Sequence, residues 1–310
     1  MPVKMNVLSF GLVFLIGILS PGIKAQDVIP VIYTKGGGFE PDTIIKYKEA
    51  KEASLRLYVF YPDDYEAGEE RPAIVFYFGG GWKGGHVSQF YPQSEYLASR
   101  GIVAICAQYR IGRHGAEPWQ CVEDAKSAIR YVRKNAKTLG INPDKLAAGG
   151  GSAGGHLAAA TATIKSYDCL NDDLSFSAVP NALVLFNPVY DNGPSGYGYD
   201  RVKEYYKSFS PIDNLDGTQP PTIVFMGDLD KHTPVSTTLL YEQGMKANGN
   251  SCKTFIYKGQ KHGFFNLHKS KDKTYFIETA KEMDRFLSSQ GYLNGEPTIE
   301  EWFKLEEEKK

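Results

Sequence analysis

Apolar and polar positions divide the chain into two kinds of predicted strand. Residues 43–48 and 54–61 (SLRLYVFY) alternate apolar and polar side chains, as half-buried antiparallel strands do. Further along, short apolar runs without strict alternation are typical of strands that helices bury on both faces. These runs cover residues 72–78, 101–107, 145–149, 182–186 and 222–226, and a less apolar last strand covers residues 252–257.

The segments between these strands have the spacing of amphipathic helices. In residues 119–136, apolar Val122, Ala125, Ile129 and Val132 recur at spacings of three and four, which places them on one helix face. Further helices are expected at residues 89–99, 153–164, 235–247 and 273–287. This alternation predicts an α/β fold: a mostly parallel, doubly wound sheet with antiparallel N-terminal strands and helices on both faces.

One long polar segment, residues 190–215, separates two of the buried strands and is rich in tyrosine. A connection of that length is often a lid or a binding segment. The alternative is a surface excursion whose tyrosines pack on the edge of the sheet.

The N-terminus has the pattern of a secretory signal peptide. A short basic start is followed by an apolar run at residues 7–19, and Ala25 is a small residue suited to cleavage. A membrane anchor is the alternative, but a spanning helix needs roughly 20 apolar residues. We therefore expect a signal peptide at residues 1–25, a single domain at residues 26–310, and a secreted or periplasmic protein without a membrane segment after cleavage.

The charge balance of the chain gives no reason to expect a highly charged partner. The chain is 42% hydrophobic and 23% charged with a formal net charge of −1, so nothing in its charge favours nucleic acid or an anionic membrane as a partner. The spacing of the four cysteines does not fit a metal site, and we expect neither a metal nor a cofactor. Cys106 is expected to be a buried thiol, whereas a Cys169–Cys252 disulfide remains open.

A glycine-rich turn surrounds Ser152 in the stretch GGGSAGGH, residues 149–156. A strand precedes this stretch and a helix follows it, so the glycines allow a sharp strand-to-helix turn that holds the serine out at the edge of the sheet. A lone match to this pattern is weak. It becomes specific only with partner residues at the same edge.

A serine hydroxyl needs a base to become a nucleophile, and the base needs a carboxylate. His262 follows the last strand and is our predicted base, whereas His156 lies in the helix behind the serine and is expected to be structural. Two aspartates follow the strand at residues 222–226. Asp230 is further out and is preferred over Asp228, which we expect to cap the turn.

Oxyanion donors are expected in the stretch FGGGW, residues 78–82, which follows a buried strand. Glycines there let backbone N–H groups approach a negatively charged oxygen closely. The predicted donors are the N–H groups of Gly80, Gly81 and Ala153. The alternative is a loop whose glycines serve flexibility alone.

Together, FGGGW, GGSAGGH, GDLDKHTP and KHGF resemble the carboxylesterase branch of the α/β-hydrolases, and the chain order Ser152, Asp230, His262 is that of the superfamily. The chain is most similar to the exported BD-FAE-type acetylesterases and feruloyl esterases, over roughly residues 50–290. The resemblance implies the α/β-hydrolase fold and metal-free ester hydrolysis. One departure concerns the donor loop, where Phe78 replaces the histidine that orients this loop in the lipase-like relatives.

The resulting hypothesis is a secreted serine esterase that removes short acyl groups, above all acetyl, from an acylated oligosaccharide or polysaccharide. Feruloyl esterases, general carboxylesterases or lipases, and a non-catalytic carbohydrate-binding protein are the alternatives. Four aromatic residues are expected to bind the substrate: Trp82, Tyr190, Tyr197 and Tyr199.

Overall fold

The computed structural model describes residues 28–29, 39–269 and 273–308, so the predicted signal peptide lies outside the described residues. Within the described part of the chain, the strands form one nine-stranded sheet. The strands are β1 (Val28–Ile29), β2 (Thr43–Glu49), β3 (Ser54–Phe60), β4 (Arg71–Tyr77), β5 (Val103–Ala107), β6 (Ile141–Gly151), β7 (Ala182–Phe186), β8 (Thr222–Gly227) and β9 (Cys252–Tyr257).

The sheet is antiparallel at its N-terminal side and parallel elsewhere, as predicted. The strand order is β1-β2-β3-β5-β4-β6-β7-β8-β9. Antiparallel pairing joins β1 to β2, β2 to β3 and β3 to β5, and every later pair is parallel. The carboxyl ends of β4 and β6 to β9 therefore meet at one edge, and loops that follow these strands face one another.

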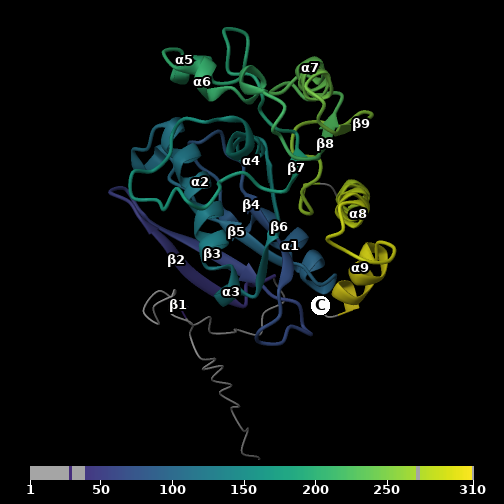
Figure 1. The fold of residues 1–310 in the computed structure, drawn as a ribbon. Coiled ribbons are helices and arrows are strands. Elements are labelled where there is room, and N and C mark those ends of the chain that lie inside the picture. The colour runs from purple at the N-terminus through teal and green to yellow at the C-terminus, as the bar shows by residue number, and fades with distance from the viewer. Residues whose placement is uncertain (1–27, 30–38, 270–272, 309–310) are drawn as a thin grey trace, which may run out of the picture.

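Helices cover both faces of the sheet. Figure 1 shows α2 and α4 packed together on one side of the strands, and α1, α8 and α9 together on the other. The helices are α1 (Tyr91–Ser99), α2 (Pro118–Lys134), α3 (Ala136–Leu139), α4 (Ala153–Thr163), α5 (Tyr199–Val202), α6 (Tyr206–Phe209), α7 (Val235–Ala247), α8 (Thr274–Ser289) and α9 (Ile299–Glu308), with 3-10 turns η2 (Val87–Phe90), η3 (Gly112–His114) and η4 (Pro211–Asn214).

The core lies between the sheet and these two helical layers. Every residue of β5, β7 and β8 is buried, which explains their continuous apolar sequences. At its carboxyl end β6 carries only alanine and glycine. This lets α4 pack closely against the sheet.

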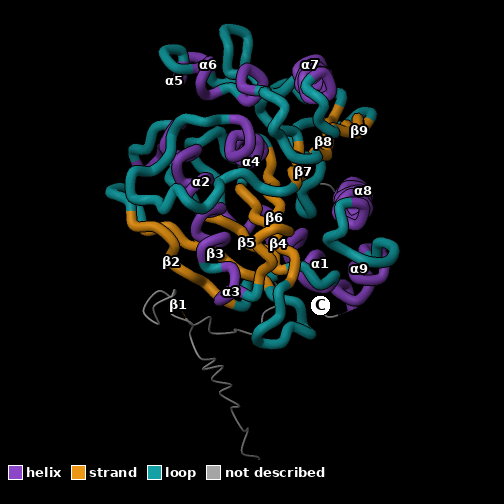
Figure 2. The backbone as a smooth tube through the Cα atoms, in the orientation of Figure 1, coloured by secondary structure: helices purple, strands orange, loops and turns teal. Residues whose placement is uncertain are grey.

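The segment at residues 190–215 contains α5, α6 and η4 joined by loops (Figure 2). Four-residue helices give no periodic signal, so the sequence pattern alone does not predict them. Figure 1 shows this segment at the opposite end of the molecule from β1.

Residues 306–308 form the last turn of α9, in which Glu307 and Glu308 are exposed. Ile299 and Trp302 are buried and give this helix an apolar face. The Trp302 ring packs against Tyr96 at 5.7 Å and stacks on Phe39 at 5.8 Å between ring centres. The buried ring of Trp302 thus holds α9 against the domain, while the outer face of this helix is acidic.

Candidate active site

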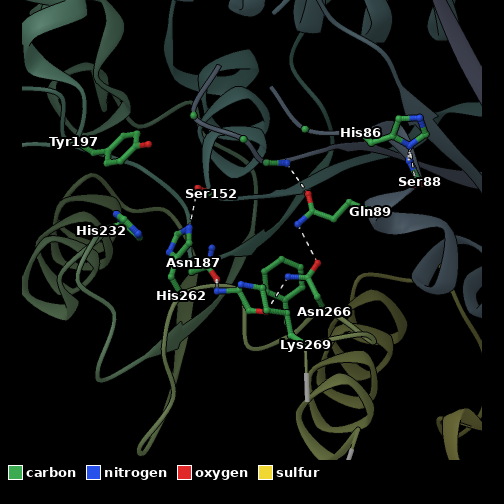
Figure 3. Close-up of a pocket in the computed structure, with 16 residues that line it drawn as sticks. His86, Ser88, Gln89, Ser152, Asn187, Tyr197, His232, His262, Asn266 and Lys269 are labelled. Carbon is green, nitrogen blue, oxygen red and sulfur yellow. Dashed lines mark hydrogen bonds between the residues drawn. The ribbon is translucent and has the colours of Figure 1, made fainter. Parts of the chain in front are cut away.

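Ser152 occupies the sharp turn between β6 and α4. Its backbone is strained, with φ 56° and ψ −120°, and such a conformation persists only where the surroundings fix it. Close backbone approach does so here, because a Cβ on Gly154 would lie 2.0 Å from the carbonyl oxygen of Tyr77. The Ser152 N–H donates to the carbonyl of Phe186 at 3.0 Å. The glycines let α4 begin against β4, and the serine side chain lines a cavity at the edge of the sheet (Figure 3).

A hydrogen-bonded relay joins the three residues predicted to carry the chemistry. His262 Nε2 lies 2.9 Å from Ser152 Oγ, and His262 Nδ1 lies 2.6 Å from Asp230 Oδ2. An ionised carboxylate only accepts hydrogen bonds, so Nδ1 carries the proton and Nε2 is free to accept the serine proton. The arrangement is that of a nucleophile, a base and an orienting carboxylate.

The loop after β8 holds the Asp230 carboxylate in place. Oδ1 accepts the backbone N–H groups of His232 at 2.8 Å and Thr233 at 3.1 Å, and Oδ2 accepts the Thr233 hydroxyl at 3.0 Å. Burial alone would raise the pKa of the carboxyl, but the hydrogen bond and charge of His262 and these N–H donors outweigh it. The pKa of Asp230 therefore lies below its ordinary value, which keeps the group ionised.

Asn187 holds the histidine loop from the end of β7. Its side chain is fully buried, and its Oδ1 accepts the N–H of Gly263, the residue after His262, at 2.8 Å. Its backbone has φ 34°, a left-handed conformation that asparagine adopts more readily than most residues. No motif in the sequence singles out Asn187. The available signal is a polar residue directly after a buried strand, at the edge where the loops meet.

The loop after β4 carries the predicted oxyanion donors. Gly80 and Gly81 have φ 131° and 60°, and both line the cavity. The N–H of Gly79 is committed elsewhere, because it donates to Gln89 Oε1 at 2.6 Å. Ala153 is the first residue of α4, where backbone N–H groups have no acceptor within the helix. The structure thus brings the predicted donors around the serine.

Phe78, which departs from the histidine of the lipase-like pattern, anchors the donor loop by stacking. Its ring lies 4.2 Å from that of Tyr109 between centres, with an interplanar angle of 17°. The Tyr109 hydroxyl donates to the Phe78 carbonyl at 2.7 Å. A stacked aromatic pair and a backbone hydrogen bond fix the start of the loop.

The cavity that contains the relay has a volume of about 430 Å³, and most of the side chains in its wall carry polar groups. The rings of Tyr197 and Phe265 are its aromatic side chains among the residues that the structure describes. The polar side chains that line it beside the relay are His86, Ser88, Gln89, Asn187, His232, Asn266 and Lys269, most of them visible in Figure 3. Such a wall offers many hydrogen-bonding groups beside the apolar surface of the two rings and the glycine backbone.

Of the four predicted substrate-binding residues, Tyr197 lines the cavity and Trp82 does not. The Trp82 side chain is 1% exposed and packs edge-on against His156 at 4.9 Å and Phe209 at 5.4 Å between ring centres. The prediction for Trp82 is therefore wrong. Its ring turns inward because α4 and α6 offer an aromatic pocket there.

Tyr190 and Tyr199 are also outside the cavity wall. Tyr190 is 1% exposed and stacks on Tyr241 of α7 at 3.9 Å between ring centres. Tyr199 begins α5 and packs edge-on against Tyr206 at 5.6 Å. Both residues stabilise the segment at residues 190–215, so their assignment to substrate binding is corrected.

The alternative residues weighed against the relay lie elsewhere. His156 is fully buried and donates from Nε2 to the Phe209 carbonyl at 2.8 Å, and desolvation lowers its pKa to about 3. It is a neutral core residue, as expected. Asp228 accepts the N–H of Gly259 at 2.6 Å and so fixes a neighbouring turn.

All four cysteines are free thiols, so the possible Cys169–Cys252 disulfide is not formed. Burial raises the pKa of Cys106 and of Cys252 to about 12, which leaves both thiols protonated. Within the described residues, no cluster of His, Cys, Asp or Glu is arranged to hold a metal ion. Over the same part of the chain, none of the helices is long and apolar enough to span a membrane.

Comparison with known sequences matches the part of the chain that contains the donor loop and Ser152 to a described family. Residues 57–192 match the family described as BD-FAE. Over 208 residues the chain is 29% identical to an acetylxylan esterase of Xylanibacter ruminicola, which covers 62% of this chain and 41% of the relative. It is 28% identical to esterase LipC of Mycobacterium tuberculosis, covering 62% of this chain and 53% of the relative. The chain spans about half the length of these curated relatives.

Solved structures agree over a larger part of the chain. A thermophilic esterase of the planctomycete Thermogutta terrifontis, solved with propionate bound, is 40% identical with a TM-score of 0.78. The match covers 82% of this chain and 96% of that one. Esterase 2 of the same organism, phosphorylated by paraoxon, matches with a TM-score of 0.77, 40% identity and coverage of 82% and 95%. The predicted fold is confirmed by these neighbours.

Proposed function

This chain belongs to the BD-FAE-type carboxylesterases of the α/β-hydrolase fold, and from this premise we propose that it is a serine esterase that removes acetyl groups from carbohydrates. The observation that carries the proposal is the set of hydrogen-bonding side chains that line the cavity around the Ser152–His262–Asp230 relay. The relay supports ester hydrolysis, and the hydrogen-bonding side chains in the cavity wall support a carbohydrate as the proposed substrate. The acetylxylan esterase among the relatives supports the same substrate class.

In the proposed reaction, His262 Nε2 accepts the proton of Ser152 as Oγ attacks the ester carbonyl. The protonated imidazole then gives this proton to the oxygen of the leaving alcohol, and the acyl group stays on the serine. Water, deprotonated by His262, attacks the acyl-serine. The imidazolium then gives this proton to Ser152 Oγ as the bond between the acyl carbon and Oγ breaks and the carboxylic acid leaves. Asp230 stabilises the imidazolium that forms in both steps and remains ionised itself.

The carbonyl oxygen gains negative charge in each tetrahedral intermediate. The N–H groups of Gly80, Gly81 and Ala153 are the donors that we assign to it. Donors already held in place stabilise this charge without reorganising, and removing one typically costs about 10²- to 10³-fold in kcat.

The wall of the cavity favours a sugar over a long apolar chain. Sugar hydroxyls need hydrogen-bond partners, and most of the side chains in the cavity wall carry amide, imidazole, hydroxyl or ammonium groups. A lipase substrate would meet mainly Phe265 and Tyr197 as apolar surface. A feruloyl ester remains the alternative substrate, because its aromatic ring could pack against these two rings.

We further propose that the protein acts outside the cytoplasm, secreted or in the periplasm, as the pattern at residues 1–25 suggests. Polymeric carbohydrate is met there. Cell fractionation with an activity assay tests this location, and activity confined to the cytoplasm would contradict it.

The direct test measures acetate and ferulate released from acetylated and feruloylated xylan, with Ser152→Ala as the control. Acetate released by the unmodified protein alone supports the proposal. Preferential release of ferulate would favour the feruloyl alternative. If an aryl acetate is cleaved and neither xylan is, the substrate class is wrong, and glycan binding without any hydrolysis would indicate a non-catalytic binding protein.

A further inference from the structure

The donor loop after β4 needs an anchor, because three successive residues leave the usual backbone regions. The φ values of Gly80, Gly81 and Trp82 are 131°, 60° and 59°. Glycine adopts such values readily, but the conformation is strained for Trp82 and persists only where neighbouring groups hold it. Local hydrogen bonds stabilise part of this loop, since the N–H groups of Lys83 and Gly84 both donate to the Gly80 carbonyl at 3.1 Å.

The next carbonyl along the loop, that of Gly81, is held from a distant segment. Arg201 in α5 donates from Nη1 to this oxygen at 2.5 Å. A hydrogen bond from a charged guanidinium is stronger than one between neutral groups. Since the bond fixes the carbonyl, it also fixes the plane of the peptide that joins Gly81 to Trp82.

Aromatic rings hold the Arg201 side chain in turn. Its guanidinium carbon lies 5.1 Å from the centre of the Trp82 ring and 5.7 Å from that of Tyr197, within the range of cation–π attraction. Trp82 is part of the donor loop and Tyr197 is part of the cavity wall. Arg201 therefore ties the loop to the segment at residues 190–215.

Gly198 provides the space that the guanidinium occupies. Its φ is 77°, and a Cβ at this position would lie 2.7 Å from Arg201 Nη2 and 3.2 Å from Cζ3 of Trp82. The arginine can fold back onto the donor loop only because residue 198 has no side chain.

We propose that Arg201 is a positioning residue for the oxyanion donors. It holds the Gly81 carbonyl and so limits rotation about the backbone of Gly81, which keeps the preceding peptide, with the Gly81 N–H, in the orientation that a developing oxyanion requires. This inference rests on the proposed function, because it takes Gly81 as a donor. It also gives the segment at residues 190–215 a role as a support for the donor loop, in place of a histidine at position 78.

The test compares Arg201→Met with Lys203→Met, using an aryl acetate as substrate. Lys203 is an exposed cation in the same segment, so its variant controls for the loss of one charge. We expect Arg201→Met to lower kcat by about 10- to 100-fold with little change in KM, because a displaced donor stabilises the transition state and hardly affects substrate binding. Lys203→Met should keep both constants, and added ethylguanidinium should restore part of the kcat of Arg201→Met.

Gly198→Ala is a second, independent variant, in which the new Cβ displaces a guanidinium that keeps its charge. The same fall in kcat is expected, and melting temperatures show that each variant is folded; if Arg201→Met does not fold, this variant alone carries the test. Unchanged kcat in folded protein, a rise in KM alone, or an equal fall in Lys203→Met would overturn the proposal. Failure of the proposed function would instead appear as Ser152-independent or absent hydrolysis in the unmodified protein.

Discussion

Asp230 keeps the imidazole of His262 in one tautomer, because a buried carboxylate accepts the Nδ1 proton and offers none in return. We predict that Asp230→Asn lowers kcat by about 10⁴-fold, as an amide can present the wrong group to the ring. Asp228→Asn is the matched control, since Asp228 bonds to the Gly259 N–H and lies outside the relay. Steady-state kinetics on an aryl acetate measures both, and equal losses would contradict the assignment.

Asn187 acts on the relay through the loop that carries His262. Asn187→Gly removes the oxygen that accepts the Gly263 N–H but tolerates the backbone φ of 34°. We expect kcat to fall by about 10-fold, in line with a misplaced catalytic group. Asn187→Ala should match this fall and also lower the free energy of unfolding by about 1 kcal/mol, the cost of a left-handed alanine. Full kcat in Asn187→Gly would show that the loop carrying His262 keeps its position without the hydrogen bond from Gly263 to Asn187.

His156 makes the stability of the protein sensitive to acid. Its pKa is about 3 when buried against an ordinary value of 6.5, so between these values the unfolded chain binds a proton that the folded chain does not. The free energy of unfolding therefore falls as pH decreases through this window, by up to about 1.4 kcal/mol per pH unit from this residue. His156→Gln keeps a donor for the Phe209 carbonyl and removes the titration. Urea unfolding at pH 6.5, 5.5 and 4.5 should show a shallower decline for the variant, and parallel declines would refute this origin.

Among the elements, the contact between β4 and α4 determines whether the turn at Ser152 forms. Gly154→Ala would place a methyl group 2.0 Å from the Tyr77 carbonyl and 2.5 Å from that of Phe78, both rigid backbone atoms. We expect a loss of several kcal/mol in the free energy of unfolding, or no folded protein. Gly244→Ala in α7 meets only the flexible Leu215 side chain, at 2.7 Å, and should stay within about 1 kcal/mol of the unmodified protein. Chemical denaturation compares the two, and similar effects would contradict the packing argument.

The elements differ in how far the sequence determines them. Both β7 and β9 are predicted to the residue. The placement of β7 follows from a fully buried apolar run bounded by turn residues, whereas β9 is a partly exposed edge strand. The start of β6 and the helix α9 are not predicted. Residues 141–145 are mainly polar, and α9 depends on contacts between Trp302 and residues far away in the chain.

For the molecule as a whole, the parallel sheet explains why distant residues meet. Ser152 follows β6, Asp230 follows β8, His262 follows β9 and the glycine loop follows β4, so all of them lie at one edge. Chain order and strand ends are therefore enough to predict these positions. The direction in which a loop side chain turns depends on tertiary packing, which is why Trp82 and Tyr190 were predicted at the cavity and lie in the core.

The most direct test of the central claim is a titration with paraoxon, which phosphorylates the related esterase. Acetate release from acetylated xylan is measured at each step, and the labelled residue is identified by peptide mass spectrometry. We predict that one phosphoryl group per chain attaches to Ser152 and that acetate release falls in the same proportion. Label on another residue, or acetate release that survives full labelling of Ser152, would contradict the account.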